Sequence, residues 1–189
     1  ENVNLIKLMI TGGVLDAKEK GVPGELKMAP EMVKAVCNRA HALGYQVAAH
    51  VESPQGVRVA LETVWIRSSM GQNRMRTLQH YLKKTVLFRW QHFVRLCHMV
   101  FFDCQVSHAT KEQKANGKVV FDGIIEMAKK SGTRVPVGLG TDTACPFVTQ
   151  YDMWRELDFY GKYCGVSNAF ALYTGTLLNA TLAGVGDVT

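Results

Sequence analysis

Short apolar runs of strand length alternate along this chain with stretches in which apolar residues recur at the spacing of one helix face. The expected strands cover residues 3–10, 45–51 and 135–139. The expected helices cover residues 30–43, 54–61, 119–130 and 151–163, followed by a last helix that Ser167 caps and that runs toward Gly184. Strands separated by helices predict parallel βα units, and therefore an α/β fold with functional residues in the loops after the strands.

Polar residues stand in or just after these strands at three places. Lys7 lies in Asn-Leu-Ile-Lys-Leu-Met-Ile-Thr-Gly-Gly, His50 in Val-Ala-Ala-His-Val-Glu-Ser, and Asp142 in Gly-Leu-Gly-Thr-Asp-Thr. A lone His or Asp at a strand end is commonly a hydrogen-bonded polar group or a cap. A lysine inside a buried strand costs desolvation energy unless it is neutralised, paired or modified. Together, the three residue types at strand ends favour a metal site on top of an α/β barrel.

Two loop segments next to these residues have alternative interpretations. Residues 11–13, Thr-Gly-Gly, either let the backbone approach a ligand closely or form a plain tight turn. Glu52 and Ser53 follow His50 in a strand-to-helix loop, where both can face a substrate, and Ser53 can instead cap the helix that starts at Pro54.

Length and composition limit the interpretation. The chain has 189 residues, whereas a complete eight-stranded α/β barrel takes about 250, so a barrel interpretation implies that part of it is missing. The sequence starts at Glu1 without Met and contains neither a transmembrane-length apolar run nor a signal-peptide pattern, so we expect a soluble, cytoplasmic protein whose true start lies upstream. The five cysteines form no Cys-x-x-Cys pair, which favours reduced thiols over a disulfide framework.

The net charge of +6 arises in one segment. Seven of the 22 basic residues and none of the 16 acidic ones lie between Thr63 and Phe102, where the regular pattern of apolar positions also fails. A basic segment with Trp and His residues could bind nucleic acid through phosphate contacts and stacking, but this one contains no folded recognition motif. We therefore expect neither a nucleic-acid partner nor a membrane partner, and treat residues 64–102 as anomalous.

Three motifs, taken in order, resemble a known family. They are Ile-Lys-Leu-Met-Ile-Thr-Gly-Gly at 6–13, Ala-His-Ala-Leu-Gly-Tyr-Gln-Val-Ala-Ala-His at 40–50 and Gly-Leu-Gly-Thr-Asp at 138–142. In this combination the chain resembles the amidohydrolase superfamily, and within it the imidazolonepropionase-related and prolidase-like (Xaa-Pro or Xaa-Arg peptidase) branch. The resemblance covers residues 1–62 and 106–189.

The resemblance implies a metal-dependent (β/α)8 barrel of the TIM type. Residues 1–189 would form one incomplete barrel domain, roughly from strand four to strand eight. Lys7 would be the carboxylated lysine that bridges two zinc ions, and His50 the fifth-strand ligand. Asp142 would be the eighth-strand ligand, which also takes a proton from the metal-activated water and passes it to the leaving amine. Carboxylation would turn a cation into a two-oxygen anionic ligand. The substrate-binding residues stay unassigned.

Two parts of the family pattern are missing. The chain has no His-x-His pair, whose strand would precede Glu1, and residues 64–71 stand where a Glu-His-Gly motif is expected. One permitted set of codons for residues 63–72, read from the third base, encodes Gly-Val-Asp-Ser-Ile-Glu-His-Gly-Ala. A similar shift over residues 91–99 yields Ala-Thr-Leu-Cys-Pro, again close to the family pattern. We therefore hypothesise that residues 64–102 are translated out of frame.

These observations indicate a fragment of a zinc-dependent amidohydrolase that acts on an amide or peptide bond of a small substrate, such as a dipeptide or an acylated amino acid. Because ligands are missing, we expect this chain alone to hold no stoichiometric zinc and to be inactive. The alternative is a non-catalytic barrel remnant. Exposed strand edges would favour homo-oligomers.

Overall fold

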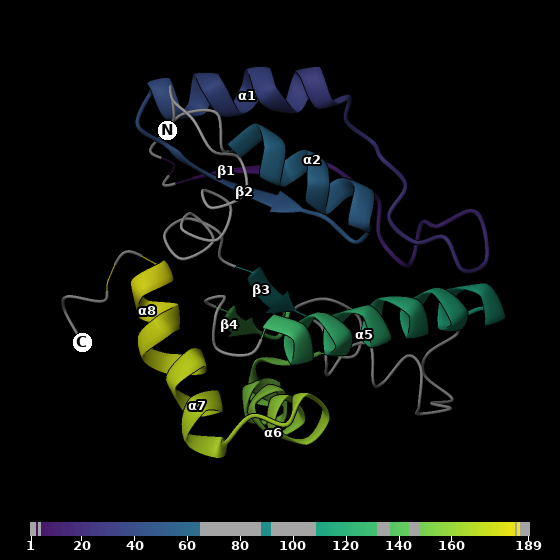
Figure 1. Ribbon diagram of the computed structural model, residues 1–189, viewed down its shortest axis with the longest axis vertical. Helices are drawn as coiled ribbons and strands as arrows, with labels where there is room; N and C mark the ends of the chain where they lie inside the picture. Colours follow the sequence, from purple (N-terminus) through teal and green to yellow (C-terminus); the bar gives the residue numbers. More distant parts are fainter. Residues whose placement is uncertain are drawn as a thin grey trace. The chain divides into compact units, whose positions relative to one another are not determined.

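The computed structural model describes residues 3, 5–64, 88–91, 109–131, 137–143, 148–183 and 185. The chain divides into two compact units, of which the first contains residues 1–72 and 110–120 and the second residues 73–109 and 121–189. Each unit contains one pair of parallel strands (Figure 1). Helix α5 (Lys111–Ser131) contributes its first half to the first unit and its second half to the second.

The first unit alternates strands and helices. β1 (Leu5–Met9), α1 (Pro30–Ala42), β2 (Gln46–His50) and α2 (Pro54–Val64) follow one another along the chain. β1 and β2 pair in parallel, with Leu5 opposite Gln46 and Met9 opposite His50. Two parallel strands need a crossover connection, and α1 provides it.

One face of the β1–β2 pair packs against α1 and α2. The core of this unit contains Leu8, Ile10, Val33, Cys37 and Val59. Leu5, Lys7 and Met9 point to the other face, because successive side chains of a strand alternate, and all three are exposed. The expectation of a strand buried throughout residues 3–10 is therefore wrong for every second residue of β1.

α1 begins and ends where the sequence predicts. Pro30 opens the helix, where its missing N–H is no loss. Gly44, just after the helix, has a φ of 83°, a left-handed conformation that favours glycine. Met32 and Leu43 are apolar, and both are exposed. The buried residues of α1 are Val33, Cys37 and Ala40.

The second unit contains two strands and several helices. They are β3 (Phe88–Gln91), β4 (Val137–Gly140), α6 (Met153–Cys164), α7 (Asn168–Tyr173), a π turn (Thr174–Leu178) and α8 (Asn179–Leu182). β3 and β4 pair in parallel, with Phe88 opposite Val137. β3 lies in the stretch where the sequence predicts no regular element. Apart from Val64 and β3, the anomalous segment 64–102 lies outside the described residues.

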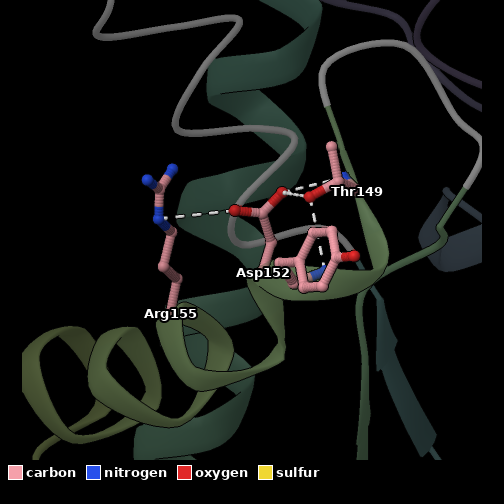
Figure 2. A network of polar contacts seen from close by, with 4 residues as sticks. Thr149, Asp152 and Arg155 are labelled. Atoms are coloured by element: carbon pink, nitrogen blue, oxygen red, sulfur yellow. Dashed lines mark hydrogen bonds and ion pairs between the residues drawn. The ribbon is translucent and has the colours of Figure 1, made fainter.

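A polar network caps the short 3-10 turn Gln150–Asp152, which leads directly into α6 (Figure 2). Asp152 Oδ2 accepts hydrogen bonds from the Thr149 backbone N–H at 2.8 Å and from the Thr149 hydroxyl at 3.0 Å, and Asp152 Oδ1 lies 3.4 Å from Arg155 Nε. The Thr149 hydroxyl also accepts from the Tyr151 N–H. This network satisfies backbone donors that a helix start leaves without intrahelical partners.

Aromatic contacts connect α6 with its neighbours in the second unit. The Tyr163 ring meets Phe121 of α5 edge-on, with ring centroids 5.2 Å apart, and the Tyr160 ring lies 6.4 Å from Phe170 of α7. The expected cap of α7 is confirmed, since the Ser167 hydroxyl accepts from the Phe170 N–H. These ring contacts join α6 to α5 and α7.

The mixed order of strands and helices, with parallel pairing, agrees with the predicted α/β class. The described residues contain two two-stranded sheets, so closure into a barrel and the assignment of strands four to eight stay predictions. None of the helices in the described ranges is both long and apolar enough to cross a membrane.

Candidate functional site

Lys7 and His50 lie on the same face of the β1–β2 pair. Lys7 is opposite Ala48, and Met9 is opposite His50. Alternate residues of a strand share a face, so the two side chains are two positions apart on the face opposite α1 and α2, about 7 Å along the strand direction. His50 ends β2, as the sequence predicts, whereas Lys7 is the central residue of β1.

The exposure of Lys7 corrects one argument made from the sequence. Lys7 does not lie in an apolar interior: it is exposed, between Leu5 and Met9, which are 47% and 52% exposed. An ammonium in contact with water carries no desolvation penalty. Burial therefore gives no reason for Lys7 to be modified, and its carboxylation stays a prediction from the family resemblance.

Glu52 contacts His50. Its Oε1 lies 3.6 Å from His50 Nε2, and 7% of the Glu52 side chain and 21% of the His50 side chain are exposed. The Glu52 carboxylate lies against Gly13, where a Cβ would be 3.3 Å from Oε2. The Glu52 backbone lies against Gly24, which has a φ of 81° and where a Cβ would be 2.6 Å from the carbonyl carbon. The two glycines thus let the chain close around Glu52.

Thr11 joins the ends of both strands. It is fully buried, its N–H donates to the His50 carbonyl at 3.3 Å, and its hydroxyl accepts from the Glu52 N–H at 3.0 Å. A Cβ on Gly56 of α2 would overlap the Thr11 methyl group, so glycine is required for this approach. Ser53 caps α2 by accepting from the Gly56 N–H at 3.1 Å, which confirms the capping interpretation of Ser53.

The loop between β1 and α1 closes at its base. The Lys27 N–H donates to the Ile10 carbonyl at 2.8 Å, and the Gly12 N–H donates to the Glu25 carbonyl at 2.9 Å. Lys27 Nζ also pairs with Glu25 at 2.7 Å, and this hydrogen bond lowers the pKa of Glu25 and raises that of Lys27. Both side chains are exposed, so the pair adds little stability.

The tip of the same loop is held by α5. Asn116 is fully buried, its Oδ1 accepts from the Gly21 N–H at 2.5 Å, and its Nδ2 donates to the Glu19 carbonyl at 3.1 Å. Gln113 Nε2 donates to the Leu15 carbonyl at 3.2 Å. These side-chain amides replace the backbone partners that a strand or helix would supply.

Asp142 follows β4 in the second unit. Its φ is 57°, and no other non-glycine residue in the described part of the chain has a positive φ. Asp adopts this left-handed conformation more readily than most residues. The hydroxyl oxygens of Thr141 and Thr143 on either side are 2.6 Å apart. The predicted position past a strand end is confirmed, and backbone strain of this kind clusters at functional sites.

The described residues fit part of a metal site. His50 and Glu52 offer an imidazole and a carboxylate, donor types that suit zinc. A catalytic zinc takes about three protein ligands, and no cluster of three His, Cys, Asp or Glu residues occurs in the described ranges. Lys7 and His50 share one face of the first unit, while Asp142 belongs to the second unit.

The sequence alone indicates only that Glu52 lies in a strand-to-helix loop, where it can face a substrate. The structure adds its contact with His50 and its burial. The spacing His-x-Glu directly after a strand was the available signal, because residues two positions apart in extended backbone point to the same side. For Thr11, nothing in the local sequence indicates that it forms hydrogen bonds with both His50 and Glu52.

Comparisons with known proteins give matches among solved structures. No protein-family model matches the sequence, and a search of curated proteins finds no match. A putative prolidase from Bifidobacterium longum is 31% identical, over 97% of this chain and 46% of that one, with a TM-score of 0.78. A Xaa-Pro dipeptidase with methionine bound in its active site is 20% identical, over 97% and 44% of the two chains, with a TM-score of 0.69.

A prolidase complexed with N-methylphosphonate-L-proline is 17% identical, over 96% of this chain and 43% of that one, with a TM-score of 0.69. At these lower identities, the dipeptidase and this prolidase show a shared fold alone. The chain spans less than half the length of each of the three structures.

Proposed function

This chain is a prolidase-like relative of the amidohydrolase superfamily, and we propose that it is a portion of a metal-dependent hydrolase that cleaves a C–N bond of a small substrate. The observation that carries the proposal is the 31% identity to a putative prolidase over 97% of the chain. Because the chain spans 46% of that structure, the activity is proposed for a longer protein of this kind.

The proposed metal ligands are carboxylated Lys7, His50 and Asp142, around two zinc ions. The ions would supply a polarised water that is easily deprotonated near neutral pH. His50 would contribute a neutral imidazole, held next to Glu52. The Asp142 carboxylate would accept the proton of the attacking water and deliver it to the leaving nitrogen of the substrate. The position of His50 at the end of β2 and that of Asp142 after β4 support these roles.

The proposed substrate class is a dipeptide or an acylated amino acid. The related dipeptidase carries methionine in its active site, and the related prolidase carries a phosphonate derivative of proline. Both ligands support a small substrate built from one or two amino-acid units. We propose that this hydrolase is cytoplasmic and that residues 1–189 form strands four to eight of its barrel. We also propose that the chain self-associates through exposed strand edges.

We also propose that the 189-residue chain alone is inactive, because it contains no His-x-His pair and no Glu-His-Gly motif. Zinc content of the purified chain and turnover of an Xaa-Pro and Xaa-Arg dipeptide panel test this statement. The expected results are substoichiometric zinc and no hydrolysis. Tightly bound zinc at two ions per chain, together with turnover, would contradict it.

A repaired gene tests the function itself. Genomic sequencing should find upstream codons for a His-x-His strand and, across residues 64–102, a frame that restores Glu-His-Gly. The repaired, zinc-loaded protein should hydrolyse dipeptides. His50→Ala should abolish this activity, whereas His41→Ala on α1 should retain it. A repaired protein that holds zinc and hydrolyses no member of the panel would rule out the proposed function.

A further inference from the structure

Glu52 is held more firmly than an ordinary loop residue. Its N–H donates to the hydroxyl of Thr11, which is fully buried. Its backbone lies beneath Gly24 and its carboxylate lies against Gly13. Two chain segments, namely residues 11–13 just after β1 and the turn at Gly24, therefore set the position of one carboxylate.

This carboxylate faces the imidazole ring of His50. Glu52 Oε1 lies 3.6 Å from His50 Nε2, slightly beyond hydrogen-bond length. Glu52 is the more buried of the two side chains, at 7% against 21% exposed. In a partly buried site a carboxylate at this distance still attracts an imidazole N–H, because the effective dielectric constant is lower than in water.

A carboxylate next to an imidazole orients the ring. A histidine at the end of a strand can in principle adopt several staggered side-chain conformations. A neighbouring carboxylate that is itself fixed lowers the energy of the one in which a ring nitrogen faces it. The remaining ring nitrogen is then presented in one direction to any ligand. A carboxylate can orient a neighbouring ring in this way only if its own conformation is restricted. The contacts of Glu52 with Thr11, Gly13 and Gly24 restrict it.

We propose that Glu52 is a positioning residue that orients the His50 imidazole, and that Thr11, Gly13 and Gly24 hold Glu52 in place for this purpose. This inference depends on the proposed function of the chain only in treating His50 as a residue of the functional site. The orientation itself is a property of the metal-free chain. It can therefore be tested without metal and without activity.

The test uses labelling of individual histidines by diethyl pyrocarbonate, with peptide mapping, at about pH 8.5, where imidazoles are neutral. Glu52→Gln keeps the shape of the side chain and removes its charge. We expect His50 in this variant to be labelled about five-fold faster than in the unmodified chain, because the ring is no longer held against its neighbour. His41 on α1 is the internal reference and should not change.

A matched variant controls for the substitution itself. Glu62→Gln makes the same change at an exposed position of α2 and should leave His50 labelling unchanged. Unchanged labelling of His50 in Glu52→Gln would overturn the proposal, and so would an equal increase in Glu62→Gln. Failure of a repaired enzyme to hydrolyse dipeptides would leave this labelling result intact, so the two proposals fail separately.

A second pair of variants keeps the test decisive if Glu52→Gln does not fold. Gly24→Ala pushes on the Glu52 backbone, while Gly44→Ala places the same substitution at a similar φ, 83° against 81°, with nothing within 4 Å. We expect faster His50 labelling in Gly24→Ala only. Equal labelling of His50 in the two alanine variants would overturn the proposal. Circular dichroism confirms that each variant is folded before it is labelled.

Discussion

The Glu52 carboxylate lies 3.6 Å from the His50 imidazole just after the carboxyl end of β2. The two residues are separated by one position, so the extended backbone after the strand already directs them to the same side. Their burial has a different origin, since Gly13 and Gly24, which close around Glu52, belong to the loop before α1. The pair is thus formed locally and held by tertiary contacts.

The approach of Gly24 to Glu52 predicts unequal costs for two similar substitutions. Gly24→Ala and Gly44→Ala both place a Cβ in a left-handed conformation, which costs about 1 kcal/mol. Only at Gly24 would the Cβ also meet backbone atoms, at 2.6 Å from the Glu52 carbonyl carbon. We expect Gly24→Ala to lower the free energy of unfolding by roughly 1–3 kcal/mol more than Gly44→Ala. Urea denaturation measures both, and equal losses would contradict the contact.

Replacing a glycine inside a helix by alanine ordinarily stabilises a protein. At Gly56 we expect the opposite, because of its contact with Thr11. Gly123→Ala in α5, with nothing within 4 Å, should stabilise the chain by up to about 1 kcal/mol. Gly56→Ala should instead destabilise it by about 1–3 kcal/mol, because the new Cβ overlaps the Thr11 methyl group.

A double-mutant cycle isolates this overlap. Thr11→Ser removes the methyl group and keeps the hydroxyl that accepts from Glu52. The combined variant should recover most of the loss caused by Gly56→Ala. A coupling energy near zero in denaturant unfolding would show that Thr11 and Gly56 do not oppose each other in this way.

Asn116 should control the local stability of the loop tip. The apolar side chains of this tip, Leu15 and Val22, are exposed and contribute little packing. The hydrogen bonds of Asn116 to Gly21 and Glu19 therefore hold the tip in place. In Asn116→Ala, tryptic cleavage after Lys20 should be roughly ten-fold faster.

The control for this experiment is Asn38→Ala, an exposed position of α1. It should leave the rate of cleavage unchanged when both proteins are folded by circular dichroism. If cleavage after Lys20 is equally fast in the two variants, the amide of Asn116 does not hold the loop.

The left-handed backbone of Asp142 predicts an order of stability among its variants. Asp142→Gly and Asp142→Asn should unfold within about 0.5 kcal/mol of the unmodified chain, because both residues accept a φ of 57°. Asp142→Ala should be less stable by about 1 kcal/mol. Thermal or urea unfolding measures the series. An alanine variant as stable as the glycine variant would mean that this backbone conformation carries no strain.

Two buried acids on α6 predict a loss of stability at alkaline pH. Burial raises the pKa of Tyr160 to about 12 and that of Cys164 to about 11, from 10.0 and 9.0. Both groups are neutral below their unfolded pKa, where their full contribution to stability is present. The free energy of unfolding should therefore be level near neutral pH and fall by a few kcal/mol, on the order of 2 per group, between about pH 9 and 12.

Variants separate the two contributions. Cys164→Ala should remove the part of the fall that begins near pH 9, and Tyr160→Phe the part that begins near pH 10. Tyr151→Phe, at a residue that is 76% exposed, is the control and should keep the full pH dependence. The measurement is the midpoint of urea unfolding across this pH range. The same pH dependence in all three variants would show that Tyr160 and Cys164 do not cause the loss of stability.

The sequence predicts helix starts best where a proline or a capping side chain marks the first turn. Pro30 and Pro54 open helices at the expected residues, and Ser167 caps α7 as expected. The prediction for α5 starts at residue 119, whereas the helix begins at Lys111. Its first turns carry polar side chains such as Asn116, which contacts a loop by hydrogen bonds and so leaves no apolar period to detect. β3 has four residues and no flanking signal.

The local sequence was sufficient to identify α/β alternation, the positions of His50 and Asp142 at or after strand ends, and the family resemblance that the 31% identity supports. These properties depend on neighbouring residues, whose spacing and chirality act over a few positions. Both faces of β1 carry apolar residues, so the local sequence does not show which face packs against the helices. The tertiary structure decides this, and it leaves Lys7 exposed. Folding also brought Gly13, Gly24 and Thr11 around Glu52, since contacts between distant segments follow from packing that no local pattern encodes.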